Sequence, residues 1–167
     1  STEAEQVSAL GAIGVPAEGD VLTSAMAGAL PVAPGERVLV CGGPGVTEAV
    51  ARRGAIAVTD GPCDAVMVGF HRTFTYERLR VAATAVQTGA RLIGTNDDAT
   101  YPTPEGPIPG GGAILAAVEV GSETKAVVAG KPVISTGFPH AVELLSGGAG
   151  IIVPQRDPEA IAAALRR

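Results

Sequence analysis

Aromatic side chains are scarce in this sequence, where phenylalanine and tyrosine together make up 3% of the residues and tryptophan is absent. Hydrophobic residues nevertheless account for 46% of the chain, so a sizeable core can form. That core must consist mainly of valine, isoleucine, leucine and alanine. Such a composition is typical of helices packed on a largely parallel sheet, and it predicts a globular α/β protein.

Long apolar runs, clustered cations and metal-ligand spacings are also missing. No apolar run reaches the ~18 residues of a membrane span, and no basic start precedes an apolar stretch. Cys41 and Cys63 have no second cysteine or histidine at ligand spacing, so we interpret them as buried structural thiols. The net charge of −5, with scattered basic residues, favours neither nucleic acid nor an anionic membrane as a partner. We expect a cytoplasmic protein. Because the chain starts on a helix cap, we also expect it to be either a fragment or an engineered chain.

Short branched apolar runs alternate with helical patterns along most of the chain. This alternation predicts right-handed βαβ units, and hence an α/β fold with three layers, α/β/α, around a mostly parallel sheet. The expected strands are 37–41, 55–58, 64–69 and 91–95, with a strand or turn at 125–130 and further strands in "PVIST" and "GIIVP". The expected helices are a short one after the Thr2–Glu5 capping box, then 18–30, 45–53, 75–88, 113–120, "PHAVELL" and one capped by Asp157.

The segment 94–113, "GTNDDATYPTPEGPIPGGGA", is unusually long for a loop in a small domain. Its four prolines restrict the free chain, and the run 110–112 of three glycines lets the backbone turn or approach a partner closely. Such a loop is either a binding loop or a plain crossover between a strand and a helix. The composition alone leaves both interpretations open.

Few residues of this sequence are candidates for catalysis, phosphate binding or metal binding. The turn "CGGPGV" at 41–46 could cradle a phosphate, but it lacks the Lys-Ser/Thr of a P-loop, and a tight strand-to-helix turn explains it better. His71 and His140 lie far apart in the sequence, and we expect each to make a local hydrogen bond. Asp97 and Asp98 form the adjacent carboxylate pair of the loop, but neighbouring side chains at a strand end point apart. We therefore predict no catalytic residue and no metal ligand in this chain.

Several motifs resemble, in order, one protein family. "VGFHRTFTYERL", "GTNDDATYPTPEGPIPGGG" and "AVVAGKP" are similar to the large α/β cap of haloacid dehalogenase superfamily phosphatases of the p-nitrophenylphosphatase and phosphoglycolate phosphatase type. The resemblance covers residues 1–131 as a cap-like domain. It implies that the loop 95–112 selects the substrate, and it makes Thr95, Asn96, Asp97 and Lys131 the candidate substrate-binding residues. His71 stands where that family leads us to expect an aspartate.

The same resemblance implies a chain that is not catalytic by itself. The family's D-x-D-G-T nucleophile motif does not occur in this sequence, and no G-D dipeptide stands after the cap-like segment, where the family has its metal-binding motif. We therefore expect no cofactor for this chain, although the resembled phosphatases use Mg²⁺, and a small phosphorylated metabolite as partner only in a complete enzyme. The alternative is one part of a Mg²⁺-dependent phosphate monoester hydrolase that another chain completes. A homodimer also stays open.

The last part of the chain, 132–167, resembles a different family. "GKPVI", "ELL", "GAGIIVP" and "DPEAIAAAL" follow the order found in the C-terminal part of retaining GT-B-type glycosyltransferases. This resemblance implies a βαβα segment, a chimera of two families, and a remnant nucleotide-sugar-binding segment as a further alternative function. We expect its apolar runs, around Val133 and Ile151, to extend the same sheet as 37–41 or 91–95 because two short strands are too few to stand alone.

Overall fold

The computed structural model describes residues 2–128, 133–136, 150–154, 157, 159–160 and 163. The chain divides into two compact units, residues 1–130 and 131–167. Unit 1 holds the helices α1 (Glu3–Ala12), α2 (Ser24–Gly28), α3 (Pro44–Arg52), α4 (Tyr76–Gln87) and α5 (Gly111–Ser122). Its strands are β1 (Arg37–Cys41), β2 (Ile56–Val58), β3 (Ala65–Val68), β4 (Arg91–Gly94), β5 (Thr100–Tyr101), β6 (Ile108–Pro109) and β7 (Val127–Val128).

The main sheet of unit 1 has five parallel strands in the order β2-β1-β3-β4-β7. From β1 the chain passes through α3 to β2 on one side, then returns to the other side of β1 for β3, β4 and β7. The direction of winding therefore reverses between β1 and β3. In open α/β sheets the crevice at such a reversal, beyond the carboxyl ends of the strands, is where ligands bind.

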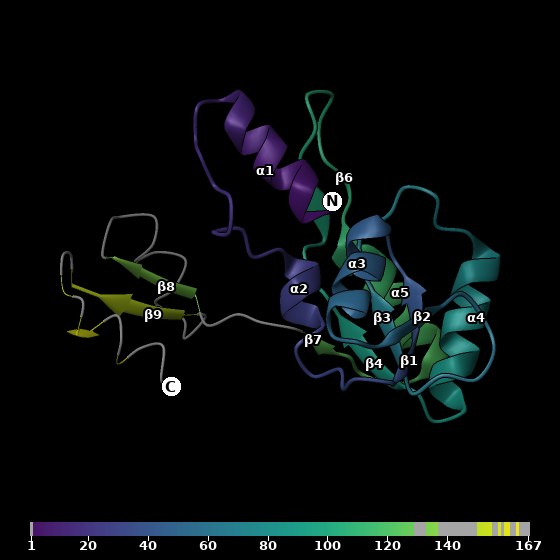
Figure 1. Ribbon diagram of the computed structural model, residues 1–167. Helices are drawn as coiled ribbons and strands as arrows, with labels where there is room; N and C mark the ends of the chain where they lie inside the picture. Colours follow the sequence, from purple (N-terminus) through teal and green to yellow (C-terminus); the bar gives the residue numbers. More distant parts are fainter. Residues whose placement is uncertain are drawn as a thin grey trace. The chain divides into compact units, whose positions relative to one another are not determined.

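Helices cover both faces of this sheet, which confirms the expected α/β fold with three layers (Figure 1). Alternate strand residues serve the two faces, since successive side chains of a strand point in opposite directions. Val38, Val40 and Met67 pack with α2 and α3 on one face. Leu39 and Val66 pack with α4 and α5 on the other. The two apolar layers hold the carboxyl ends of the strands in a fixed arrangement.

The expected helix 18–30 is shorter in the structure and is confined to α2. Gly19 has a φ of +82°, a left-handed conformation that ends any helix before it can reach Thr23. Thr23 then caps α2, because its hydroxyl accepts a hydrogen bond from the backbone N–H of Met26 at 3.2 Å. The apolar spacing of this segment therefore predicted the helix but not its start.

The long loop after β4 contains a small antiparallel hairpin of β5 and β6, which extends away from the main sheet (Figure 1). At its tip the N–H and hydroxyl of Thr103 both donate to the Gly106 carbonyl, at 3.2 and 2.6 Å. This hairpin was not predictable from the sequence, because each strand has only two residues and proline occupies one of the four positions. The loop after β4 thus forms a paired hairpin that extends beyond the edge of the main sheet.

Unit 2 contains the strands β8 (Val133–Thr136) and β9 (Gly150–Val153), which pair with each other in parallel. Among the described residues β8 and β9 pair with each other, and the expectation that they extend the main sheet remains a prediction. Apolar runs predict strands, but they do not determine which neighbour a strand pairs with. The predicted cap is confirmed, since the Asp157 carboxylate accepts from the backbone N–H of Ala160 at 2.9 Å.

Candidate functional site

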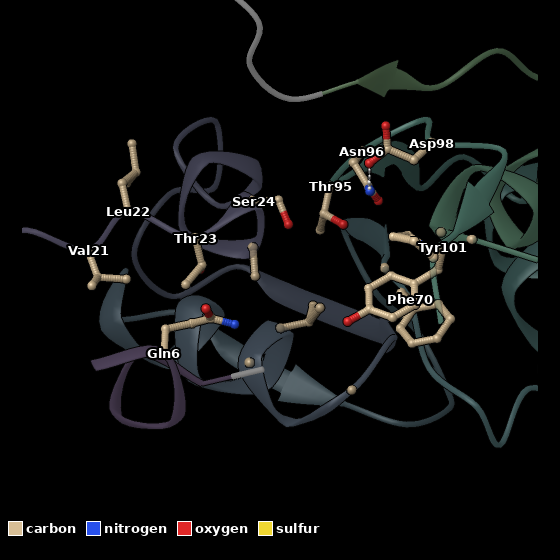
Figure 2. A pocket seen from close by; sticks show the side chains of 18 of the residues that line it. Gln6, Val21, Leu22, Thr23, Ser24, Phe70, Thr95, Asn96, Asp98 and Tyr101 are labelled. Atoms are coloured by element: carbon tan, nitrogen blue, oxygen red, sulfur yellow. Dashed lines mark hydrogen bonds between the residues drawn. The ribbon is translucent and has the colours of Figure 1, made fainter. Parts of the chain in front are cut away.

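The carboxyl ends of β1, β3 and β4 lie side by side and lead into a cavity of about 640 Å³. The amino ends of α3 and α5 and the hairpin complete its walls, together with residues from α1 and the start of α2. The residues that line it are Gln6, Val21, Leu22, Thr23, Ser24, Ala25, Gly43, Gly45, Val46, Gly69, Phe70, Thr95, Asn96, Asp98, Thr100, Tyr101, Pro102, Gly110 and Gly111. Figure 2 shows the labelled side chains around this space.

Thr95, the first candidate residue, follows β4 directly and is 4% exposed. Its backbone N–H donates to the Val68 carbonyl at 2.9 Å, which fixes its position at the end of the sheet. Thr95 lines the cavity, and among the buried side-chain polar atoms of the described residues only His71 Nε2 lacks a hydrogen-bond partner. A Cβ at Gly69 would lie 3.1 Å from Thr95 Oγ1, so the glycine leaves space beside that hydroxyl.

Asn96 is half-buried, and its amide nitrogen donates to Oδ2 of Asp98 at 2.6 Å (Figure 2). Asp97 is exposed, whereas Asn96 turns inward beside the start of α5, where a Cβ at Gly111 would collide with its Oδ1. Lys131 lies outside the described residues. The roles of Thr95, Asn96, Asp97 and Lys131 in substrate binding remain predictions.

Asn96→Ala is expected to lower the free energy of unfolding by about 1 kcal/mol, because it removes a charge-assisted hydrogen bond from the half-buried Asn96 to the exposed Asp98 carboxylate. Urea melts of Asn96→Ala, Asp98→Ala and the double variant measure it. If the bond matters, the double variant loses less than the sum of the single variants. Additive losses would mean that the two side chains do not support each other.

An aromatic pair forms one wall of the cavity. Phe70 follows β3 by two residues, and its ring stacks on that of Tyr101 from β5 with centroids 5.1 Å apart and 12° between the planes. The contact attaches the hairpin to the sheet. Sequence reasoning missed both residues and Asp98, although Phe70 could have been found because it stands at the carboxyl end of a predicted strand.

The glycine-rich turn after β1 is a tight strand-to-helix connection. Gly43 is the N-cap of α3 without a side-chain bond, Pro44 occupies the first helical position, and the N–H of Val46 donates to the Gly43 carbonyl at 3.0 Å. Proline has no N–H, so this helix start offers few donors to an anion. The geometry favours the turn over the phosphate cradle.

His71 makes the local contact that was expected and leaves one nitrogen unpaired. Its Nδ1 lies 3.4 Å from the Thr73 hydroxyl, its ring meets Phe74 edge-on, and its Nε2 is buried without a partner among the described residues. Burial first, and then the guanidinium of Arg78, lower the pKa of His71 below its usual 6.5. His140 lies outside the described residues.

Acidification is expected to destabilise the protein through His71. Because its folded pKa is lowered, the unfolded chain binds the proton more tightly. The stabilising contribution is therefore complete above pH 6.5 and decreases as the pH falls through the folded pKa. Urea melts at pH 7.5 and 5.5 check this against His71→Gln, which cannot titrate and should lose less stability between the two values. An equal loss in both proteins would contradict the assignment.

The described residues do not fit Mg²⁺, the ion that the resembled phosphatases use. Among them no three histidine, cysteine, aspartate or glutamate side chains lie close enough together to hold a metal ion, and the Asp98 carboxylate is engaged by Asn96.

Cys41 is buried, which raises the pKa of its thiol to about 11, and Cys63 is half-buried. Both thiols are therefore protonated at neutral pH. Within the described part of the chain, no helix has the length and hydropathy of a membrane span.

Comparisons with known proteins point to phosphatases. The chain is 39% identical over 132 residues to the acid sugar phosphatase of Staphylococcus saprophyticus, covering 77% of this chain and 51% of that protein. The glycerol phosphate phosphatase structure from Mycobacterium tuberculosis matches with a TM-score of 0.75 at 34% identity, over 79% of this chain and 41% of that one. A double-mutant thermostable NPPase from Geobacillus stearothermophilus matches with a TM-score of 0.75 at 30% identity, over 90% of this chain and 68% of that one. No family model matches the sequence.

The chain spans about half the length of the curated relatives that it matches. The match to the NPPase extends beyond unit 1, which holds 130 of the 167 residues. These comparisons give no support to a glycosyltransferase part or to a chimera. By homology and by fold, the chain belongs to the phosphatases of the haloacid dehalogenase superfamily.

Proposed function

We propose that this chain is the substrate-selecting cap of a haloacid dehalogenase-type phosphatase that acts on small phosphate monoesters, and that it does not hydrolyse them alone. One observation carries the proposal: the loop that the family resemblance assigns to substrate selection forms a wall of the cavity at the carboxyl edge of the sheet. The names of the relatives, acid sugar phosphatase and glycerol phosphate phosphatase, support a phosphorylated small molecule as the substrate.

Closure of such a cap would place the cavity over the phosphate ester. Thr95 and Asn96, at the end of β4, would then face the leaving group. The motifs that supply the nucleophile and hold Mg²⁺ in the resembled family are not present in this sequence. The two apolar layers keep the strand ends in place, so the cavity needs little rearrangement when a substrate enters.

Transfer of the cap tests this function. Residues 24–128 would replace the matching segment of the Staphylococcus saprophyticus acid sugar phosphatase, and kcat/KM would be measured on a panel of phosphate monoesters. We expect the hybrid to keep Mg²⁺-dependent turnover and to change its order of preferred substrates. A folded, active hybrid with the unchanged order of the relative would contradict a selecting role.

The chain alone is expected to show no Mg²⁺-stimulated turnover of p-nitrophenyl phosphate. Superfamily chemistry proceeds through an aspartyl-phosphate, and the nucleophile motif is absent from the sequence. Release of p-nitrophenol is compared with buffer, with and without Mg²⁺. Turnover above the buffer rate that is stimulated by Mg²⁺ and survives Lys131→Ala would show that the chain holds a catalytic site that we have missed.

A nucleotide-sugar-binding role for 132–167 rests on the order of its sequence motifs alone. A thermal-shift titration with UDP- and GDP-sugars tests it. The phosphatase relationship leads us to expect no shift with either.

A further inference from the structure

The imidazole of His71 carries the one buried side-chain polar atom that has no hydrogen-bond partner among the described residues. Its Nε2 is covered by protein, whereas its Nδ1 lies 3.4 Å from the Thr73 hydroxyl and its ring meets that of Phe74 edge-on. For a neutral imidazole this burial costs one hydrogen bond to water. For an imidazolium it would leave a charged N–H unpaired, which costs far more. The turn therefore holds His71 in its neutral form.

The charged groups around His71 strengthen this preference. Arg78 of α4 is the cation that acts on the imidazole, and its Nη1 donates at 2.7 Å to the backbone carbonyl that follows β2, which fixes the guanidinium. Glu77 of the same helix turn is engaged by Arg80. The end of β1 contributes the thiol of Cys41, which is neutral because burial raises its pKa to about 11. The starts of α3 and α5 contribute only glycine and proline. A proton on His71 thus has a like charge nearby, and no carboxylate of the described residues pairs with it.

Phe70, which precedes His71 in the chain, belongs to the wall of the cavity. Its ring stacks on that of Tyr101 and so attaches the hairpin to the sheet (Figure 2). Its backbone lies between two helix starts, because a Cβ at Gly43 would lie 3.4 Å from the Phe70 carbonyl oxygen and one at Gly111 would lie 3.4 Å from the Phe70 nitrogen. The ring that holds the hairpin and the ring that can take up a proton therefore stand on consecutive residues of one closely packed turn.

We propose that His71 positions the hairpin through Phe70, and that protonation of His71 releases the Phe70–Tyr101 stack and opens this wall of the cavity. The protonated ring moves out to water, since His71 is only half-buried. The turn then loses the contacts of that ring with Thr73 and Phe74, and the Phe70 ring moves with it. Protonation favours the released turn tenfold more for each unit by which the pKa there exceeds that in the closed turn. The proposal rests on the proposed function, to which it adds a dependence of the cavity on pH.

An NMR titration of the full chain from pH 7.5 to 5.0 tests the proposal without any substrate. Burial and Arg78 lower the pKa of His71, so the midpoint of its Cε1 proton is expected below 6.5. We expect the ring-current shift of the Tyr101 ring protons to decrease at least twofold with the same midpoint, and the NOEs between the rings of Phe70 and Tyr101 to weaken. Tyr101 resonances that stay unchanged down to pH 5.0, or that follow a different midpoint, would overturn the proposal. Neither outcome affects the cap-transfer result.

Four variants localise the effect. His71→Gln cannot take up the proton and is expected to keep the stack at pH 5.0, whereas a response of unchanged size in this variant would overturn the proposal. Phe70→Leu should separate the two events, so that His71 still titrates and the Tyr101 resonances no longer follow it. Arg78→Gln removes the neighbouring cation and should move the shared midpoint upward. His140→Gln removes the other histidine of the sequence and is the matched control, in which the response of Tyr101 should be unchanged.

Discussion

Gly112→Ala is expected to lower the free energy of unfolding by about 3 kcal/mol, although alanine is a better helix former than glycine. Gly112 is the second residue of α5, and a Cβ there would collide with the carbonyl oxygen of Asp97 and lie 2.8 Å from the carbonyl carbon of Asp98. Both atoms belong to backbone, which cannot rotate aside as a side chain could. The loop after β4 would have to separate from the helix and break the bond from the Gly112 N–H to the Asp98 carbonyl.

Gly121→Ala is the matched control for this change. It lies near the other end of α5, where a Cβ would meet the Ala83 side chain at 3.3 Å and that of Leu79 at 3.7 Å. We expect a change of less than about 1 kcal/mol in either direction, because tight packing and improved helix propensity oppose each other. Urea melts compare the two variants at unchanged m-value. Equal midpoints would mean that the loop does not press on the helix start.

At Gly110 the cost of a substitution comes from a steric contact with the loop and not from the backbone angle φ. A β-branched residue at Gly110 would strain the backbone if the native φ were positive, but φ is −90°. The cost instead comes from space, because a Cβ would collide with the Asp98 carbonyl oxygen and lie 2.9 Å from the carbonyl carbon of Thr100.

Leu39→Ala is expected to lower the free energy of unfolding by about 4 kcal/mol. Leu39 lies in β1, the strand between β2 and β3, and has no exposed surface. Removing its branched end leaves a cavity among Val66, Ala82 and other residues of the same cluster, which neighbouring strands and helices cannot close. Leu30→Ala is the control, since Leu30 is 63% exposed and should lose less than about 0.5 kcal/mol. Similar midpoints for both variants in urea would contradict the core assignment.

The sheet strands were predictable because they are short, branched and bounded by turn residues. The expected 37–41 matches β1, and 64–69 and 91–95 contain β3 and β4. The predicted helix 113–120 is shorter than α5 (Gly111–Ser122) at both ends. Glycine does not predict a helix, and α5 begins with two glycines. Strand order was not predictable at all, since periodicity identifies the buried face of a strand but not its neighbour.

The candidate site was predictable where it depended on strand ends. Thr95 and Asn96 follow a predicted strand, and the structure places both on the cavity wall. Tyr101 and Asp98 were not predictable in the same way. The position of Tyr101 depends on a hairpin whose strands have only two residues each, and that of Asp98 on its hydrogen bond with Asn96. Contacts of this kind depend on the local backbone conformation of the loop, which hydrophobic periodicity does not predict.

The all-parallel sheet has a consequence for the rate of folding. No two of its paired strands are joined by a tight turn. Val38 of β1, for example, pairs with Ala65 of the neighbouring strand β3, and the chain passes through α3 and β2 between them. Each pairing therefore requires a long segment to close before it gains any contacts, and a high proportion of such contacts slows folding. The chain should fold more slowly than a helical bundle of the same length, and its apolar strands stay exposed for longer after synthesis.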